Sequence, residues 1–211
     1  MVKKLLTIAF TFACAVLFGS CDSSDDVVVD QFTLDENLFS KTYTVDGDGC
    51  CVLNGLKPIA GTEVQSKVAN YGWKSIAEYD LQDNGKLSKE NYFDDVVGGG
   101  PTHYWFESSQ QMVKYTYIDA MPANSFWRMT WSYDEAKGFI LFGDSNSKLA
   151  DRYEQILEIQ ESGGNTLMYT MSKSGIRADG TVIYAMIVYK RMTDEELKKT
   201  QQNYTYDLNN K

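Results

Sequence analysis

Side chains that could carry out catalysis or bind a metal are few and scattered in this sequence. His103 is the only histidine, which excludes a multi-histidine metal site and leaves one residue for any catalytic triad. It precedes the aromatic run Tyr104-Trp105-Phe106, a pattern that predicts a half-buried histidine in a strand. No Gly-x-Ser-x-Gly nucleophile motif occurs, and Gly98–Pro101 lacks the lysine and the helix of a phosphate-binding loop.

Oxygen ligands and carboxylates give a similarly weak pattern. Asp144–Lys148 begins with the spacing of a calcium loop but lacks its glycine and its closing glutamate, so a turn is the favoured interpretation. Among 29 Asp and Glu residues, one pair could act as acid and base in a cleft, which keeps a carboxylate hydrolase as a third hypothesis. No pair stands out by its position. We therefore expect no enzymatic activity, no cofactor and no metal.

Two of the four cysteines, Cys50 and Cys51, are adjacent in the sequence. They could form a strained vicinal disulfide in an oxidising compartment or remain as two thiols. Adjacent cysteines cannot link distant parts of a fold, and the Cys-x-x-Cys spacing of redox proteins is absent. We expect a structural or incidental role.

Residues 1–20 have the composition of an export signal. Lys3 and Lys4 precede an apolar stretch from Leu5 to Phe18, which is shorter than the roughly 20 residues of a transmembrane helix. The following Leu17-Phe18-Gly19-Ser20-Cys21 resembles the lipobox of bacterial lipoproteins. The resemblance implies cleavage before Cys21 and lipidation of its thiol. An ordinary secretory signal with a chance cysteine is the alternative.

Residues 21–36 follow as an acidic tether. Asp22-Ser23-Ser24-Asp25-Asp26 cannot fold by itself and resembles the surface-export signal of some Gram-negative lipoproteins. The resemblance implies a lipid-anchored protein of the outer membrane that faces the cell surface. A solvated tether on a periplasm-facing protein is the simpler alternative.

Charge narrows the range of partners. Loss of residues 1–20 would remove two lysines and no acid, changing the net charge from −9 to −11. Without a basic patch, nucleic-acid binding is improbable, because phosphate contacts supply most of that affinity. Attachment to a membrane would therefore come from the lipid anchor and not from charge. The length suits a single domain, residues 37–202, which we expect to be monomeric.

From Trp73 onward, short aromatic and β-branched runs alternate with turn-forming residues, which predicts consecutive antiparallel strands. About eight such strands can close into a barrel, which removes the exposed edges. An earlier extended segment is expected at Leu38–Val45. The predicted barrel strands are Trp73–Leu81, His103–Glu107, Met112–Asp119, Phe126–Tyr133, Gly138–Phe142, Tyr153–Gln160, Thr166–Ser172 and Thr181–Arg191.

Two helices should flank the strands. Thr62 and Gln65 have capping-box spacing before a short helix that Gly72 can close. Thr193-Asp194-Glu195-Glu196 is a second capping box, at the start of a C-terminal helix. The polar residues 203–211 are expected to form a flexible tail.

This arrangement resembles the lipocalin-like family over residues 61–200. The motifs that carry the resemblance are Gly72-Trp73-Lys74 at the start and Val188–Leu197 at the end. The resemblance implies an all-β fold, an antiparallel up-and-down eight-stranded barrel with a short N-terminal and a C-terminal helix. It also implies that Trp73 stacks under Arg191, or under Lys190, to close one end of the barrel.

The aromatic residues suggest what the barrel could hold. Alternation places Trp127, Met129, Trp131 and Tyr133 on one face of a strand, and gives the sets Val113, Tyr115, Tyr117 and Leu167, Tyr169, Met171 on two others. If these faces point inward, they suit a flat or apolar molecule, although a solid core without a cavity remains open. The candidate ligand-binding residues are Tyr115, Tyr117, Trp127, Met129, Trp131 and Tyr169.

The leading hypothesis is a membrane-anchored lipoprotein whose lipocalin-like barrel binds a small hydrophobic or aromatic ligand. The alternative is a cell-surface protein- or glycan-interaction module that displays its aromatic side chains outward.

Overall fold

The computed structural model describes residues 34–52, 57–95, 102–108, 110–116, 125–143 and 153–209. The chain divides into two units, Met1–Gln31 and Phe32–Lys211, and every described residue belongs to the second. The leader, Cys21, Tyr117 and the Asp144–Lys148 segment lie outside the described residues.

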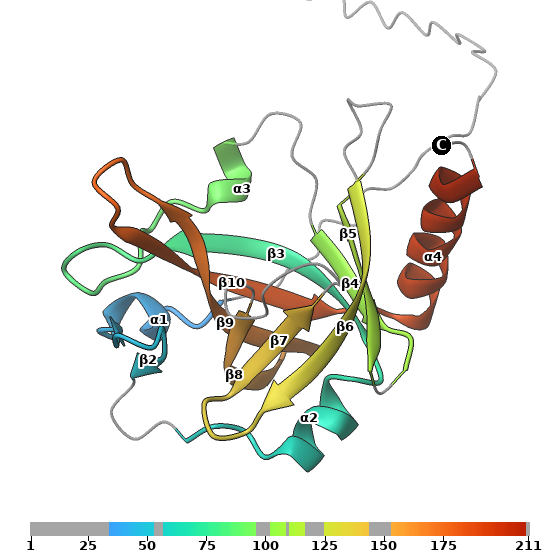
Figure 1. The fold of residues 1–211 in the computed structure, drawn as a ribbon, viewed down its shortest axis with the longest axis horizontal. Coiled ribbons are helices and arrows are strands. Elements are labelled where there is room, and N and C mark those ends of the chain that lie inside the picture. Colours follow the sequence, from blue (N-terminus) through green and yellow to red (C-terminus); the bar gives the residue numbers. More distant parts are fainter. Residues whose placement is uncertain are drawn as a thin grey trace, which may run out of the picture. The chain divides into compact units, whose positions relative to one another are not determined.

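Eight antiparallel strands close into a barrel (Figure 1). Each strand pairs with its neighbour in sequence, and the last strand pairs with the first. This confirms the predicted closed eight-stranded barrel. The strands are β3 Gly72–Asp80, β4 Thr102–Phe106, β5 Gln111–Thr116, β6 Ser125–Asp134, β7 Phe139–Gly143, β8 Tyr153–Ser162, β9 Asn165–Ile176 and β10 Val182–Arg191.

Strand β9 is longer than predicted. The sequence pattern ended it at Ser172, but it continues to Ile176 because its polar end pairs with β10, with Val182 opposite Ile176. At its other end, Gly163 and Gly164 have φ values of 57° and 81°, which lets a two-residue turn join it to β8.

The cross-strand register decides which side chains face inward. Met112 and Lys114 of β5 lie opposite Met129 and Trp127 of β6, and partners in register share a face of the sheet. The intervening residues of β5, Val113 and Tyr115, belong to a cluster with Tyr204 of the C-terminal helix. The predicted inward position of Tyr115 is therefore wrong: its face is covered from outside by this helix.

The C-terminal helix α4, Asp194–Asn209, lies against the outside of the barrel (Figure 1). Its predicted capping box is present: the Thr193 N–H donates to Glu196, and the Glu196 N–H donates to the Thr193 hydroxyl. The helix continues beyond Gln202, where the sequence predicts the tail to begin, and ends at Asn209. The polar composition concealed one apolar anchor, Tyr204, which is buried against Trp105 and Phe126.

A second segment covers another part of the barrel. It contains α1 Asn37–Ser40, β1 Thr44–Val45 and β2 Cys51–Val52. The predicted extended segment Leu38–Val45 is thus extended only at its end, since its first residues belong to α1. Its buried side chains pack with Tyr169 and Met171 of β9 in one cluster. The predicted inward position of Tyr169 is therefore also wrong.

Helix α2, Gly61–Lys67, lies at one end of the barrel (Figure 1). It begins one residue before the predicted cap Thr62; the cap is Ala60, which makes no side-chain cap hydrogen bond but accepts two backbone N–H groups. Val64 and Val68 are fully buried in the cluster that fills this end. A further short helix, α3, spans Tyr92–Asp95 after β3.

Removing the Tyr204 side chain should detach α4 from the barrel. The ring lies 5.2–6.2 Å between centroids from Phe126, Trp105 and Tyr115. We expect Tyr204→Ala to lower the free energy of unfolding by about 3–5 kcal/mol, as other large-to-small aromatic substitutions do. Urea unfolding followed by circular dichroism measures this.

Gln202→Ala is the matched control, because Gln202 is exposed on the same helix. Its effect should stay within about 0.5 kcal/mol. Equal effects of the two substitutions would contradict the anchoring role of Tyr204.

Candidate functional site

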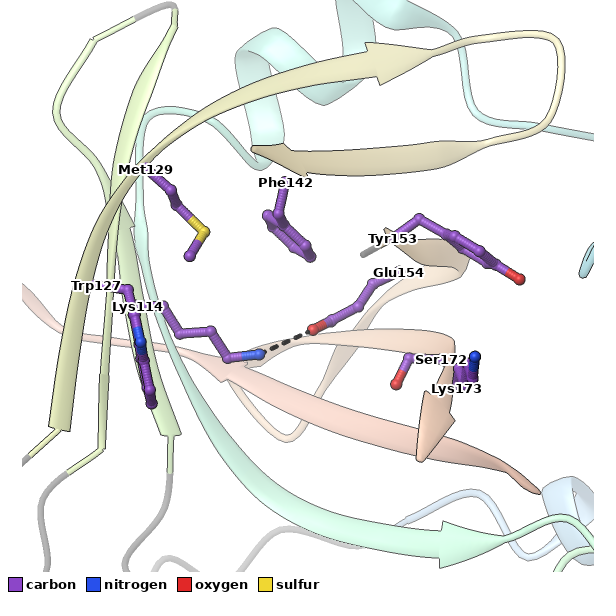
Figure 2. A pocket seen from close by; sticks show the side chains of 8 residues that line it. All are labelled: Lys114, Trp127, Met129, Phe142, Tyr153, Glu154, Ser172 and Lys173. Carbon is purple, nitrogen blue, oxygen red and sulfur yellow. Dashed lines mark hydrogen bonds and ion pairs between the residues drawn. The ribbon is translucent and has the colours of Figure 1, made fainter. Parts of the chain in front are cut away.

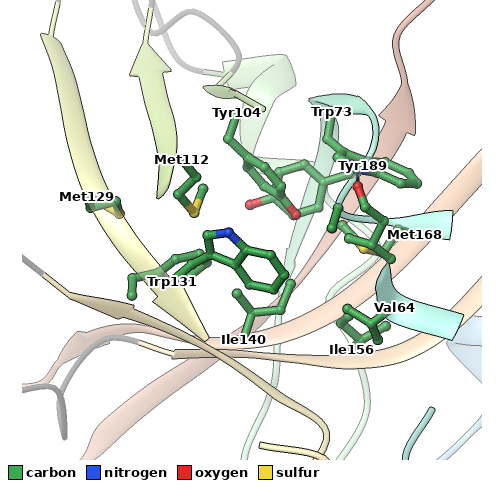
Figure 3. Packing of buried hydrophobic residues seen from close by; sticks show 13 residues of the cluster. Val64, Trp73, Tyr104, Met112, Met129, Trp131, Ile140, Ile156, Met168 and Tyr189 are labelled. Atoms are coloured by element: carbon green, nitrogen blue, oxygen red, sulfur yellow. Dashed lines mark hydrogen bonds between the residues drawn. The ribbon is translucent and has the colours of Figure 1, made fainter. Parts of the chain in front are cut away.

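The interior of the barrel consists of a packed half and an open half. In the packed half, next to α2, apolar side chains fill the space between the strands (Figure 3). Residues of this cluster include Val64, Val68, Trp73, Tyr104, Met112, Met129, Trp131, Ile140, Ile156, Met168 and Tyr189. All of these are at most 7% exposed. The sequence left a solid core open as the alternative to a cavity, and this half of the barrel has a solid core.

The open half contains a cavity of about 290 Å³ (Figure 2). It reaches inward from the end of the barrel opposite α2, where β6 begins and β7 ends. The residues that line it come from β5, β6, β7, β8 and β9: Lys114, Trp127, Met129, Phe142, Tyr153, Glu154, Ser172 and Lys173.

One wall of the cavity is apolar and is formed by Trp127, Met129 and Phe142. The Trp127 side chain is 45% exposed, whereas the other three tryptophans of the chain are at most 4% exposed. An indole held at the mouth of a cavity, and not packed, offers a flat surface to a ligand.

The opposite side of the cavity is polar and is organised around Glu154. This residue is 3% exposed, and its carboxylate accepts a hydrogen bond from the Tyr189 hydroxyl at 2.9 Å. The Thr170 hydroxyl donates to the same oxygen at 3.3 Å. Burial, together with the charge of Glu154, raises the pKa of Tyr189 well above its ordinary value, so the phenol stays protonated and remains a donor.

Lys114 completes this network from the other side of the barrel. Its Nζ lies 3.4 Å from Glu154 Oε1 and 5.7 Å from the centre of the Phe142 ring (Figure 2). The Lys114 side chain is 29% exposed, whereas that of Glu154 is 4% exposed. Of the two charges, the ammonium is therefore the one that a molecule in the cavity can reach.

Strand register places both charged residues inside. Lys114 lies opposite Trp127, and Glu154 lies opposite Ile140 on β7 and Ser172 on β9. A buried charge is costly unless it is paired, which is why the two have to meet.

Two of the predicted ligand-binding residues, Trp127 and Met129, line the cavity. Trp131 faces the same interior but belongs to the packed cluster. Tyr115 and Tyr169 lie in the two outer clusters described above, and Tyr117 lies outside the described residues.

Sequence reasoning missed the polar residues of the cavity, including Lys114, Glu154 and Ser172. A signal for Lys114 was available, because it shares the alternation of Met112 and not that of Tyr115. The alternation of aromatic residues instead predicts that the other face of β5 points inward, although that face lies under α4.

The predicted stacking of Trp73 under Arg191 is replaced by a different contact, although the strand register places the two residues together. The two residues lie opposite each other on β3 and β10. The Trp73 indole is fully buried, and its N–H donates to the Val68 carbonyl at 3.0 Å. The cation–π contact of Arg191 is with Tyr71, at 4.4 Å from the ring centre. Tyr71, directly before β3, is 37% exposed and accessible to the guanidinium.

The remaining candidates for chemistry lie elsewhere. His103 is half-buried on β4, as predicted, and lies opposite Lys74 and Tyr115. Burial, and secondarily Lys74, lowers its pKa to about 4, so it is neutral at physiological pH. Cys50 and Cys51 are free thiols, and burial raises the pKa of each. Within the described residues, no group of three or more His, Cys, Asp and Glu side chains could hold a metal ion.

The sequence matches none of the protein-family models and none of the curated proteins with which it was compared. Among the helices of the described ranges, none is long and apolar enough to cross a membrane.

Two neighbouring tyrosines provide a test of the Glu154 network. The rings of Tyr189 and Tyr104 lie 4.8 Å apart, and both are buried. The Tyr189 hydroxyl donates to Glu154, whereas that of Tyr104 has no hydrogen-bond partner in the part of the chain that the structure describes. Tyr189→Phe should lower the free energy of unfolding by about 1.5–3 kcal/mol, because a bond to a charged group is lost.

Tyr104→Phe removes the same atom from the adjacent ring and serves as its control. We expect it to be neutral or slightly stabilising, since it removes a buried polar group without a partner. Urea unfolding of both variants at pH 7 measures the difference. A larger loss for Tyr104→Phe than for Tyr189→Phe would contradict the network.

Proposed function

We propose that this protein is a membrane-anchored lipoprotein whose lipocalin-like barrel binds a small, flat ligand in the open half of its interior. The observation that carries the proposal is the cavity, with an aromatic and thioether wall on one side and a paired charge on the other. Ligand sites commonly combine an apolar lining with a few well-placed polar groups.

The size of the cavity limits the ligand. Its volume of about 290 Å³ is at the lower end of ligand pockets, which span about 300–1,000 Å³. The packed cluster below leaves no room for a long chain, because Trp131, Met112 and Tyr104 fill that half. A compact ring system suits this space better than an extended acyl chain.

Binding is favoured over catalysis by the state of the polar groups. Glu154 accepts hydrogen bonds from Tyr189 and Thr170 and forms an ion pair with Lys114. Its oxygens therefore already have partners within the protein, which is typical of a structural carboxylate and not of a catalytic one. The histidine lies on the strand face that carries Tyr115, away from the cavity.

The alternative function, a module with outward aromatic side chains, has less support. Two of the outward aromatic residues, Tyr115 and Tyr169, are at most 1% exposed because α4 and the N-terminal segment cover them. They are not available to a protein or glycan partner.

The anchor is proposed from the sequence. A lipid on Cys21 would hold the barrel at the membrane, with residues 22–36 as tether, and the acidic residues after Cys21 favour the outer membrane and the cell surface. In cells labelled with a palmitate analogue, the wild-type protein should carry the label and Cys21→Ala should not, while Cys50→Ala should keep it. Label on Cys21→Ala would contradict the anchor.

Trp127 allows a direct test of the cavity. A neutral nitroaromatic such as 4-nitrobenzamide quenches indole fluorescence when it stacks on the ring. We expect saturable quenching of the wild-type protein by this compound or by its charged analogues. Trp127→Phe should remove the saturable component, because the other three tryptophans are buried.

Tyr92→Phe is the control, as Tyr92 is a 55% exposed aromatic residue that does not line the cavity. It should leave the quenching unchanged. A linear response in the wild-type protein to every analogue would contradict binding in the cavity.

A further inference from the structure

The charged residues of the cavity indicate which kind of ligand it takes. Three of the residues that line it are charged, two lysines and one glutamate. Their sum is one positive charge, in a chain whose net charge is −9. The lining of the cavity therefore carries a positive charge in an acidic protein, although the nearby Glu78, which interacts with both Lys114 and Glu154, lies outside the lining.

The hydrogen-bonding capacity of the two partners is unequal. Both oxygens of Glu154 already have donors: Oε2 has Tyr189 and Thr170, and Oε1 has Tyr189 and Lys114. The ammonium of Lys114 has three N–H donors, and Glu154 is the one acceptor that the described residues give it. Among the described residues, the hydrogen-bonding capacity that remains at this side of the cavity is thus that of a donor.

Accessibility favours the same group. Both side chains line the cavity, but that of Lys114 is 29% exposed and that of Glu154 only 4%, because Tyr189 of β10 and Thr170 of β9 surround the carboxylate. Lys173 adds a second positive charge and Ser172 a hydroxyl donor among the residues that line the cavity. A cationic ligand would be repelled by both lysines, whereas an anionic one would be attracted by them.

We propose that the ligand is a small aromatic acid, whose ring lies against Trp127 and Phe142 and whose carboxylate accepts hydrogen bonds from Lys114. The inference rests on the proposed ligand-binding function and specifies its chemistry. The ring would pack against the apolar wall. The carboxylate would accept the hydrogen bonds that the Lys114 ammonium does not give to Glu154, and Glu154 would keep its hydrogen bond from Tyr189. Charge-assisted hydrogen bonds in a partly desolvated site are stronger than neutral ones.

Three compounds with one ring test this: 4-nitrobenzoate, 4-nitrobenzamide and 4-nitrobenzylammonium. Their dissociation constants are measured from the quenching of Trp127 fluorescence. The protein is purified in the form that cells produce and is reconstituted in phosphatidylcholine vesicles, and empty vesicles serve as blanks. We expect the carboxylate to bind about tenfold more tightly than the amide, and the cation to bind most weakly.

Variants at Lys114 separate charge from shape. Lys114→Met should abolish the preference for the carboxylate, and Lys114→Arg should keep it. Because Lys114→Met leaves Glu154 without its cation, the double variant Lys114→Met/Glu154→Gln removes both charges together and should lose the preference as well. Lys89→Met, at an exposed lysine outside the cavity, changes the net charge equally and should keep the preference.

The outcomes distinguish the two proposals. Saturable quenching without any preference for the carboxylate, or tighter binding of the cation, overturns the aromatic-acid inference and leaves the binding function standing. A double variant that still prefers the carboxylate also overturns it. Failure of all three compounds to quench saturably counts against the binding function itself.

Discussion

The buried carboxylate of Glu154 is the constraint around which the interior of this barrel is arranged. A charge that is 3% exposed has to be compensated inside the protein, and the compensation comes from three other strands: β10 supplies Tyr189, β9 supplies Thr170 and β5 supplies Lys114. Since β5 and β8 are not neighbours in the barrel, the ion pair spans its interior. Apolar packing lies on one side of it and the cavity on the other.

The outer face of the barrel is partly covered by other segments of the chain, and this determines which aromatic side chains are buried there. Small barrels expose one face of each strand, and here two segments of the same chain cover part of that surface. Tyr204 of α4 packs over β4, β5 and β6, and Tyr43 of the N-terminal segment belongs to the cluster that includes Tyr169. The outward aromatic side chains on these strands, such as Tyr115 and Tyr169, therefore contribute to the attachment of the covering segments and not to the cavity.

The sequence predicted the strands well because a half-buried strand repeats every two residues and turn residues mark its ends. Seven of the eight strands begin and end within a few residues of their predicted positions, and β9 is the exception. The alternation could not show which face points inward on β5 and β9, since both faces are buried, one by the interior and one by a covering segment. On β6 the choice was correct because Arg128 and Thr130, on the other face, are exposed.

The site was only half predictable for a related reason. Trp127 and Met129 followed from the pattern of one strand, whereas Lys114 and Glu154 are polar residues that a single strand would place in solvent. Their pairing depends on two strands that lie far apart in the sequence, and the alternation within either strand does not link them. The extent of α4 does not follow from the pattern because its last part is polar apart from Tyr204, the residue that packs against the barrel.

Because the strands run up and down, successive connections lie at opposite ends of the barrel. The connections at the end that α2 covers are short: residues 107–110, 135–138 and 163–164. The connections at the other end are residues 81–101, 117–124, 144–152 and 177–181, and the first three of these are longer. Insertions and exchanges at the cavity end can therefore change the entrance of the cavity without altering the packed half. As a scaffold for engineering, the barrel offers connections at one end that can be replaced while the packed end is kept unchanged.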